Sequence, residues 1–521
     1  MSRIPPSEAA QTENSAQTKP SPESSKGNGG GAWLLAVLIV LGAVLRFLYL
    51  SRKSFWFDEG VSVQIARLDW YNFLRILWRR EANMSLYYLL LRGWLHLGHS
   101  EFFIRSLSVL PSLACIPAIY LLGRRLFDAR VGLISAALLT FNAYAIRYAQ
   151  DARAYSLFIF LTLLSCVYFV SSAEASSRGN FLGHVISSTL AMYAHFYAGL
   201  LIVAQWLSLR FLAGEHSGGD QRCWRDHWKW IGILSAPALL FAATTGVGPL
   251  SWIKRPGFKA LYEYYEHMAG NVGVWLVLAY VLACGAALAP LGRQLFRRQR
   301  AWRIWRYEFL LIWLLFPIAF TAVVSLVRPM FVARYFVFCL PALIILAAAG
   351  LARIPRVWLL IPAVGLLLAL SLKGTLSYYE HDFDLDRDDW RSATYYILNH
   401  AKAGDVIMFH IAMSRMPYEF YKSVYPAGAR GPTVIYPARA GGINYRDFMG
   451  KPSADFIQSA AVSYDRVWVV LKDNQAKDGG PDFTTQLIGQ VFGIFYSTRN
   501  DELFSGIEVR LYEHRSGVFR H

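Results

Sequence analysis

Long apolar segments alternate with short polar loops from residue 32 to residue 372 of the chain. A helix needs about 20 predominantly apolar residues to cross a bilayer, and most of these segments approach that length. The pattern predicts a polytopic α-helical membrane protein with about eleven spans. The predicted spans are residues 33–50, 102–123, 131–147, 155–173, 181–198, 199–213, 229–246, 272–291, 309–327, 335–352 and 357–372.

The pattern changes on both sides of this region. Residues 1–31 are polar and rich in Ser, Pro, Gly and Gln, so we expect a disordered cytoplasmic tail before the transmembrane domain 32–372. In residues 373–521, segments of helical and strand periodicity alternate, which predicts a small α/β domain. The elements predicted in it are a helix over 390–401, strands over 406–409 and 466–471, a helix over 486–495 and a strand over 506–512.

The composition supports this organisation, with 55% hydrophobic, 15% aromatic and 17% charged residues. A net charge of +17 would suggest a nucleic-acid partner in a soluble protein. Here the basic residues cluster in alternate short loops, which membrane orientation explains better, so no nucleic-acid partner is predicted. The charge bias predicts an inner (plasma) membrane protein with a cytoplasmic N-terminus and a periplasmic or extracytoplasmic C-terminal domain. The basic loops are residues 124–130, 178, 222–229, 293–306 and 353–356.

The loop over residues 51–101 is the longest of the predicted external loops, and it begins with two adjacent acids, Asp58 and Glu59, among aromatic residues. Two amphipathic helices, over 69–80 and 85–97, are expected to lie in the membrane interface. The acids have two interpretations. They are either solvated groups in an interfacial aromatic belt or catalytic acids at the membrane surface.

Other ionisable residues of the external loops also lack a topological explanation. Arginines bind phosphate bidentately, and a carboxylate can take a proton from a hydroxyl, so a sugar carried on a lipid phosphate would use both. For three of these residues a structural role is the alternative: Arg105 could snorkel, Arg153 could pair locally with Asp151, and His195 could be an ordinary interfacial histidine. The candidates are Asp58, Glu59, Arg105, Asp151, Arg153, His195, Arg328 and Arg334.

Several segments resemble the GT-C type membrane glycosyltransferases, the group that includes protein O-mannosyltransferases and lipid A aminoarabinose transferases. Phe57-Asp58-Glu59 matches the acid pair of the first external loop in that group. Asn83-Met84-Ser85-Leu86-Tyr87-Tyr88 is similar to its His-Pro-Pro-Leu-Tyr-Tyr segment, with the His-Pro-Pro part replaced, so the role of the family histidine has no counterpart here. The other matching segments are residues 101–108, 148–155, 329–335 and 389–391.

The resemblance implies an inverting hexosyl- or pentosyltransferase that uses a polyprenyl-phosphate sugar at the outer face of the membrane. It implies Asp58 as general base, and we expect Glu59 to be structural or supporting. Arg328 and Arg334 are positive charges on the outer side, against the charge bias, so we expect Arg334, helped by Arg105 or Arg328, to bind the donor phosphate. Tyr335 joins the predicted substrate contacts. The acceptor is a glycan, a lipid or a protein. No cofactor is predicted, and a divalent metal ion remains an alternative that no residue spacing indicates.

A transporter or flippase of a lipid-linked sugar is the alternative function. Such a protein should place its charges near the bilayer midplane and show internal repeats, whereas here the charges lie at one end of the spans. A receptor-like sensor is a third reading, without a cytoplasmic signalling module to support it. The C-terminal domain is expected to shape acceptor access without a catalytic residue, with solvated acids in residues 382–389 and a turn at Gly441-Gly442.

Overall fold

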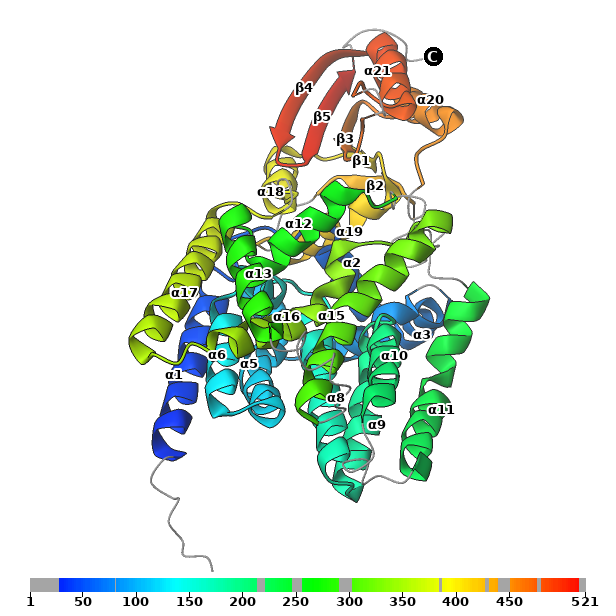
Figure 1. The fold of residues 1–521 in the computed structure, drawn as a ribbon. Coiled ribbons are helices and arrows are strands. Elements are labelled where there is room, and N and C mark those ends of the chain that lie inside the picture. The colour runs from blue at the N-terminus through cyan, green and yellow to red at the C-terminus, as the bar shows by residue number, and fades with distance from the viewer. Residues whose placement is uncertain are drawn as a thin grey trace, which may run out of the picture.

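The computed structural model describes residues 28–79, 81–212, 221–245, 255–289, 302–383, 387–426, 431–438, 450–475 and 479–514. Long helices form most of the molecule, and a five-stranded sheet with its own helices lies at one end of them (Figure 1). The Gly441-Gly442 turn and nearly all of the predicted tail lie outside the described residues.

The apolar segments form helices because a helix satisfies every backbone polar group within its own segment, as a bilayer demands. Each predicted span overlaps at least one helix. These helices are α1 (Asn28–Phe47), α5 (Glu101–Leu126), α6 (Ala129–Phe141), α7 (Ala143–Ala149), α8 (Tyr155–Glu174), α9 (Arg178–Ala194), α10 (Ala198–Ser208), α11 (Gln221–Thr245), α13 (Val274–Leu288), α15 (Trp302–Val327), the 3-10 helix η3 (Ala333–Cys339), α16 (Leu340–Leu351) and α17 (Val357–Glu380). A further helix, α12 (Phe258–Ala269), lies before α13 and outside the predicted spans.

The described residues contain 6 helices that are long and apolar enough to cross a membrane, or up to 8 if two bent pairs each count as one span. The pairs are α6 with α7, bent by 61°, and α12 with α13, bent by 79°. The first bend occurs at Asn142, whose side chain caps α7 by accepting a bond from Ala145 N and donates to Met268 O at 2.9 Å. A multi-pass helical membrane protein is therefore confirmed, and the count of eleven spans is not.

The loop between α1 and α5 contains three α-helices, α2 (Phe57–Arg67), α3 (Trp70–Arg79) and α4 (Ser85–Trp94), and the 3-10 helix η1 (Ala82–Met84). Both helices that the sequence predicts here are present as α3 and α4. Helix α3 buries Phe73 and leaves Trp70 and Trp78 more than half exposed, which suits a helix that rests on a lipid surface.

The C-terminal sheet has the strand order β2-β1-β3-β5-β4. Strands β2, β1 and β3 are parallel, and β5 pairs antiparallel with both β3 and β4. Five predicted elements are found close to their expected positions. The bounds are α18 (Trp390–His400), β1 (Val406–Phe409), α19 (Arg415–Val424), β2 (Thr433–Tyr436), α20 (Ala454–Ser463), β3 (Arg466–Leu471), α21 (Phe483–Phe495), β4 (Tyr496–Phe504) and β5 (Ile507–His514).

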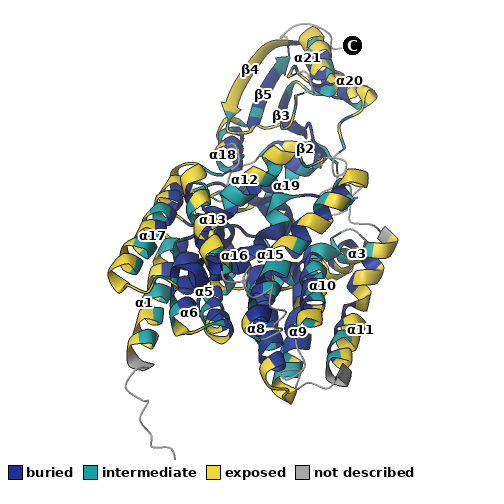
Figure 2. Ribbon diagram, viewed as in Figure 1, coloured by how far each residue is buried: buried dark blue, intermediate teal, exposed yellow. Residues whose placement is uncertain are grey.

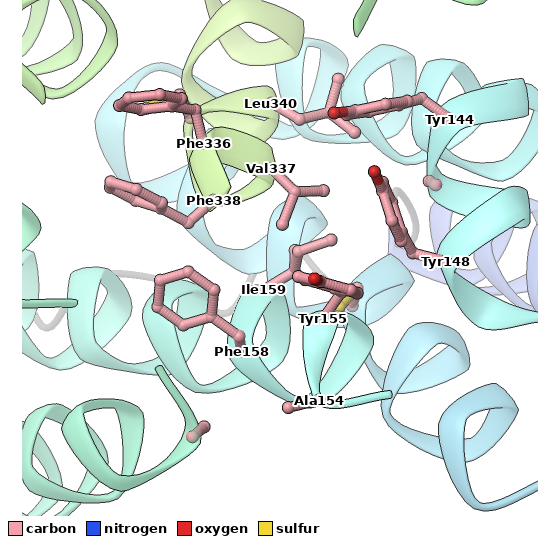
Figure 3. Packing of buried hydrophobic residues seen from close by; sticks show 14 of the residues in the cluster. Tyr144, Tyr148, Ala154, Tyr155, Phe158, Ile159, Phe336, Val337, Phe338 and Leu340 are labelled. Atoms are coloured by element: carbon pink, nitrogen blue, oxygen red, sulfur yellow. The ribbon is translucent and has the colours of Figure 1, made fainter. Parts of the chain in front are cut away.

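Burial divides the helices into inner and outer ones. Helices α8 and α16 are largely buried, whereas the outward faces of α1, α11 and α17 expose large apolar side chains, as expected of helices that face lipid (Figure 2). Aromatic residues of α7, α8 and η3 pack together in the hydrophobic core, among them Tyr144, Tyr155 and Phe336 (Figure 3).

Candidate active site

Helix α2 carries the acid pair in its first turn. The Glu59 side chain accepts a bond from the backbone N of Trp56, the residue before the helix, at 3.3 Å. Acids in the first turn also favour the helix because they complement its dipole. Since successive helical residues point about 100° apart, Asp58 and Glu59 face different surroundings.

Asp58 lies between two arginines from distant segments. Its Oδ2 is 3.8 Å from Arg153 Nη2 and 3.6 Å from Arg334 Nη2. Within the part of the chain that the structure describes, this buried Oδ2 accepts no hydrogen bond. The site therefore holds a carboxylate oxygen close to two cations and still able to accept a proton.

The two arginines are held by different means. Arg153, in the loop between α7 and α8, donates through Nη1 to Ser62 Oγ at 3.0 Å and to the Tyr88 hydroxyl at 3.3 Å. The Arg334 guanidinium carbon lies 5.5 Å from the ring centre of Trp56, and its side chain is 27% exposed. Arg334 is thus the more accessible of the two.

Glu59 is buried and paired with Arg105 in a bidentate contact, with Nε to Oε1 at 2.8 Å and Nη2 to Oε2 at 2.7 Å. The remaining three N–H groups of Arg105 donate to backbone oxygens of Leu50, Lys53 and Ser54. A guanidinium has five donors, so Arg105 has none left for a phosphate. The structure gives Arg105 a structural role instead of the predicted role in binding phosphate. The two acids therefore have different partners: Glu59 pairs with Arg105, and Asp58 lies beside Arg153 and Arg334.

Asp151 contacts the site through the side chain of Trp56. Its Oδ1 accepts the indole N–H of Trp56 at 2.8 Å. Burial, followed by the neighbouring charge of Glu59, raises the pKa of Asp151 to about 6. Asp151 therefore positions the ring over which Arg334 lies.

His195 and Tyr335 pack against each other beside the arginines, with ring centres 4.8 Å apart. His195 is buried at the break between α9 and α10, where its Nδ1 accepts the backbone N–H of Tyr197 at 3.2 Å. Its Nε2 lies 3.4 Å from the Asn83 amide, at the start of the segment where the sequence departs from the family motif.

Arg328 does not join this group. It is exposed at the end of α15, and among the described residues its side chain has no hydrogen bond or ion pair with the other candidates. Tyr88, Ser62 and Trp56 are contacts of the site that the sequence did not single out. Tyr88 lies in segment 83–88, whose resemblance to the family motif could have indicated that Tyr88 belongs to the site.

Two described acids of the 382–389 segment, Asp382 and Asp388, are not solvated, contrary to expectation, while Asp384 and Asp386 lie outside the described residues. Asp382 is paired with Arg147 at 2.9 Å and with Arg387, and Asp388 is paired with Lys472 at 2.8 Å. Burial opposes ionisation of Asp382, but Arg387 and Arg147 keep its pKa well below the usual range. Both acids hold the start of the C-terminal domain against basic side chains.

Among the described residues, no three His, Cys, Asp or Glu side chains are grouped as a metal site would require. The absence of a cofactor remains a prediction.

Comparisons with known proteins agree with the predicted resemblance. A family model described as dolichyl-phosphate-mannose-protein mannosyltransferase matches residues 85–245. No curated protein matches the chain by sequence. Among solved structures, ArnT from Cupriavidus metallidurans in the apo state is similar with a TM-score of 0.61 and 14% identity, over 95% of this chain and 100% of that chain.

Two further structures contain lipid phosphates. ArnT from the same organism bound to undecaprenyl phosphate gives a TM-score of 0.59 at 13% identity, over 95% of this chain and 100% of that one. The Archaeoglobus fulgidus oligosaccharyltransferase AglB, in complex with an inhibitory peptide and a dolichol-phosphate, gives 0.53 at 10% identity, over 95% and 75%. The resemblance to the GT-C membrane glycosyltransferases is confirmed, and at these identities the structural likeness concerns the fold.

Proposed function

We propose that this chain, which has the fold of the GT-C glycosyltransferases, transfers a sugar from a polyprenyl-phosphate donor to an acceptor hydroxyl or amine at the outer face of the membrane. Asp58 acts as the general base, and the transfer inverts the anomeric centre. The acceptor is a glycan, a lipid or a protein.

One observation carries this proposal: the Asp58 carboxylate lies between Arg153 and Arg334 with a buried oxygen that accepts no hydrogen bond from the described residues. A carboxylate held only for structure would have its oxygens satisfied by donors, as those of Glu59 are. The free oxygen supports a role in accepting a proton, and the flanking cations support a role in binding an anion.

The reaction that fits is a single displacement. The acceptor hydroxyl or amine donates its proton to Asp58 while its oxygen or nitrogen forms a bond to the anomeric carbon of the donor sugar. The bond between that carbon and the phosphate oxygen breaks, and the electron pair leaves with the phosphate. The leaving lipid phosphate gains negative charge, which Arg334 and Arg153 would stabilise.

The test uses the purified protein in detergent with undecaprenyl-phosphate sugars labelled in the sugar, and it measures release of undecaprenyl phosphate. The Asp58→Asn variant should remain folded and lose turnover. The matched control is Asp69→Asn in the same loop: Asp69 caps α3 through Asn72, and Asn caps a helix as well as Asp does. Normal turnover in Asp58→Asn would exclude Asp58 as the base.

The same assay separates an enzyme from a transporter of lipid-linked sugars. A transporter would move the donor across vesicles without releasing lipid phosphate. Asp58 lies on α2, Arg153 in the loop before α8 and Arg334 at the start of η3, and α2 packs against α19 of the C-terminal domain. A site at this end of the helices supports chemistry at a surface over passage through the membrane.

A further inference from the structure

Helix α19 of the C-terminal domain packs along α2, the helix that carries Asp58. The Phe55 and Phe420 rings lie 4.7 Å apart at one end of this contact. At the other end, Arg67 donates to Ser423 Oγ at 3.0 Å. Residues next to both ends of α2 therefore contact one turn of α19.

The buried hydroxyl of Tyr421 connects α19 to the chain just before α2. It accepts the backbone N–H of Phe55 at 2.6 Å and the Ser54 hydroxyl at 3.1 Å, and it donates to the Glu101 carboxylate. Phe55 is fully buried, so its N–H depends on this hydroxyl for a partner. Asp58 follows Phe55 by three residues.

Arg391, at the start of α18, strengthens the same junction. Its side chain forms an ion pair with Glu101 and donates to Ser51 O at 2.8 Å, while its backbone N donates to Ser54 Oγ at 3.0 Å. Two elements of the C-terminal domain thus hold the turn from which α2 starts.

The two helices also approach each other closely at a glycine. A Cβ on Gly60 would lie 3.0 Å from both Cα and Cβ of Pro417, which is tighter than ordinary van der Waals contact. Gly60 is two residues after Asp58. Any larger side chain at this position would push α2 and α19 apart.

We propose that Tyr421, supported by Arg391 and by the Gly60–Pro417 contact, is a positioning residue that holds Asp58 in its reactive orientation. The C-terminal domain then acts on the chemical step through α2, in addition to any part in admitting the acceptor. This inference rests on the proposed function of Asp58.

The expected consequence is a change in kcat without a change in donor affinity. The donor phosphate is bound by arginines outside α2, whereas the base is carried on α2, and a small displacement of a catalytic group costs rate more than binding. Transfer to the acceptor and hydrolysis of the donor by water should fall together, since both need Asp58. A domain that only docks the acceptor would affect transfer alone.

The test compares Tyr421→Phe and Gly60→Ala with Tyr425→Phe in the full-length protein. Tyr425 lies at the end of the same helix, and its hydroxyl donates to Asn399 within the C-terminal domain. Tyr421→Phe and Gly60→Ala should lower kcat for transfer and for hydrolysis by about tenfold, which corresponds to about 1.4 kcal/mol. Affinity for undecaprenyl phosphate should stay at the wild-type value, and Tyr425→Phe should behave as wild type.

Amide hydrogen exchange of residues 55–62 gives a readout that does not depend on activity. Exchange there should be faster in Tyr421→Phe than in wild type or in Tyr425→Phe. If wild type transfers no sugar, the proposed function fails, while the exchange result still tests whether Tyr421 holds α2.

Three results would overturn the positioning role. The first is an unchanged kcat in both Tyr421→Phe and Gly60→Ala. The second is a loss of transfer with normal hydrolysis, which would assign the domain to acceptor docking. The third is an equal loss in Tyr425→Phe, which would show general destabilisation of the domain.

Discussion

The Glu59–Arg105 pair allows a test of whether Arg105 stabilises the fold or binds the donor phosphate. We predict that Arg105→Met destabilises the protein strongly and that the double variant Glu59→Gln/Arg105→Met is more stable than Arg105→Met alone. The single change leaves the buried Glu59 carboxylate with the backbone N–H groups of Ala152 and Trp56 and with Arg387 Nη1 at 3.8 Å. The double change removes both charges.

The magnitude follows from burial. Both side chains are at most 1% exposed, and removing one partner of a buried pair costs about 3–5 kcal/mol. An unfolding entropy of about 2.1 cal/mol/K per residue gives about 1 °C for each kcal/mol in a chain of 521 residues, so the apparent melting temperature should fall by about 3–5 °C. Arg125→Met is the matched control, because Arg125 lies on the same helix and pairs with Glu174 at 2.9 Å on the surface. An exposed pair contributes about 0–1 kcal/mol.

The assay is a thermal melt of the solubilised protein followed by tryptophan fluorescence, together with binding of undecaprenyl phosphate. If Arg105 were a phosphate ligand, Arg105→Met would melt near the wild-type temperature and bind undecaprenyl phosphate weakly. That outcome would refute the structural assignment. A double variant that is no more stable than Arg105→Met would refute the argument about the unpaired buried charge.

Three further predictions concern the site and its orientation. Arg334→Ala should lose roughly 2–4 kcal/mol of transition-state stabilisation, seen as a fall in kcat/KM for the donor, whereas Arg328→Ala should stay near wild type. Because burial raises the pKa of Asp151 to about 6, the folded state holds a proton that the unfolded state releases between about pH 4 and 6, so the stability of the wild type should fall as the pH rises through that window. Thermal melts of Asp151→Asn, measured against pH, should show no such fall. In a Cys223→Ser background, a membrane-impermeant reagent should label Ser459→Cys and not Ser176→Cys in intact cells, which the opposite topology would reverse.

Local sequence patterns were sufficient for most of the helices and for the buried strands. Strands β1 and β3 are short, continuous apolar runs, and both have the predicted bounds of 406–409 and 466–471. Strand β4 was missed because its residues, Tyr496–Phe504, are mostly exposed and show no alternation of apolar and polar positions. It exists because β5 offers it a hydrogen-bonding edge, which no local pattern reveals.

The candidate site was predicted only in part, for a geometric reason. The sequence marks Asp58 and Glu59 as one pair, but a helix turns neighbouring residues to different faces, and the partners on those faces come from far along the chain. Arg105 is 46 residues from Glu59, and Arg334 reaches Asp58 from the segment that follows α15. Of the two positive charges that oppose the topological bias, Arg334 lies beside Asp58 in the structure and Arg328 does not, and the role of Arg334 in binding phosphate stays a prediction.

The contact between α19 and α2 shows why the boundary between a membrane domain and an outer domain is a poor guide to function. Composition separates the two clearly at about residue 373, yet the hydroxyl of Tyr421 bonds to a backbone N–H 366 residues earlier. A buried N–H must find an acceptor wherever the fold supplies one, and here the C-terminal domain supplies the acceptor for the chain that leads into α2. The helix that carries Asp58 therefore belongs to both parts of the molecule.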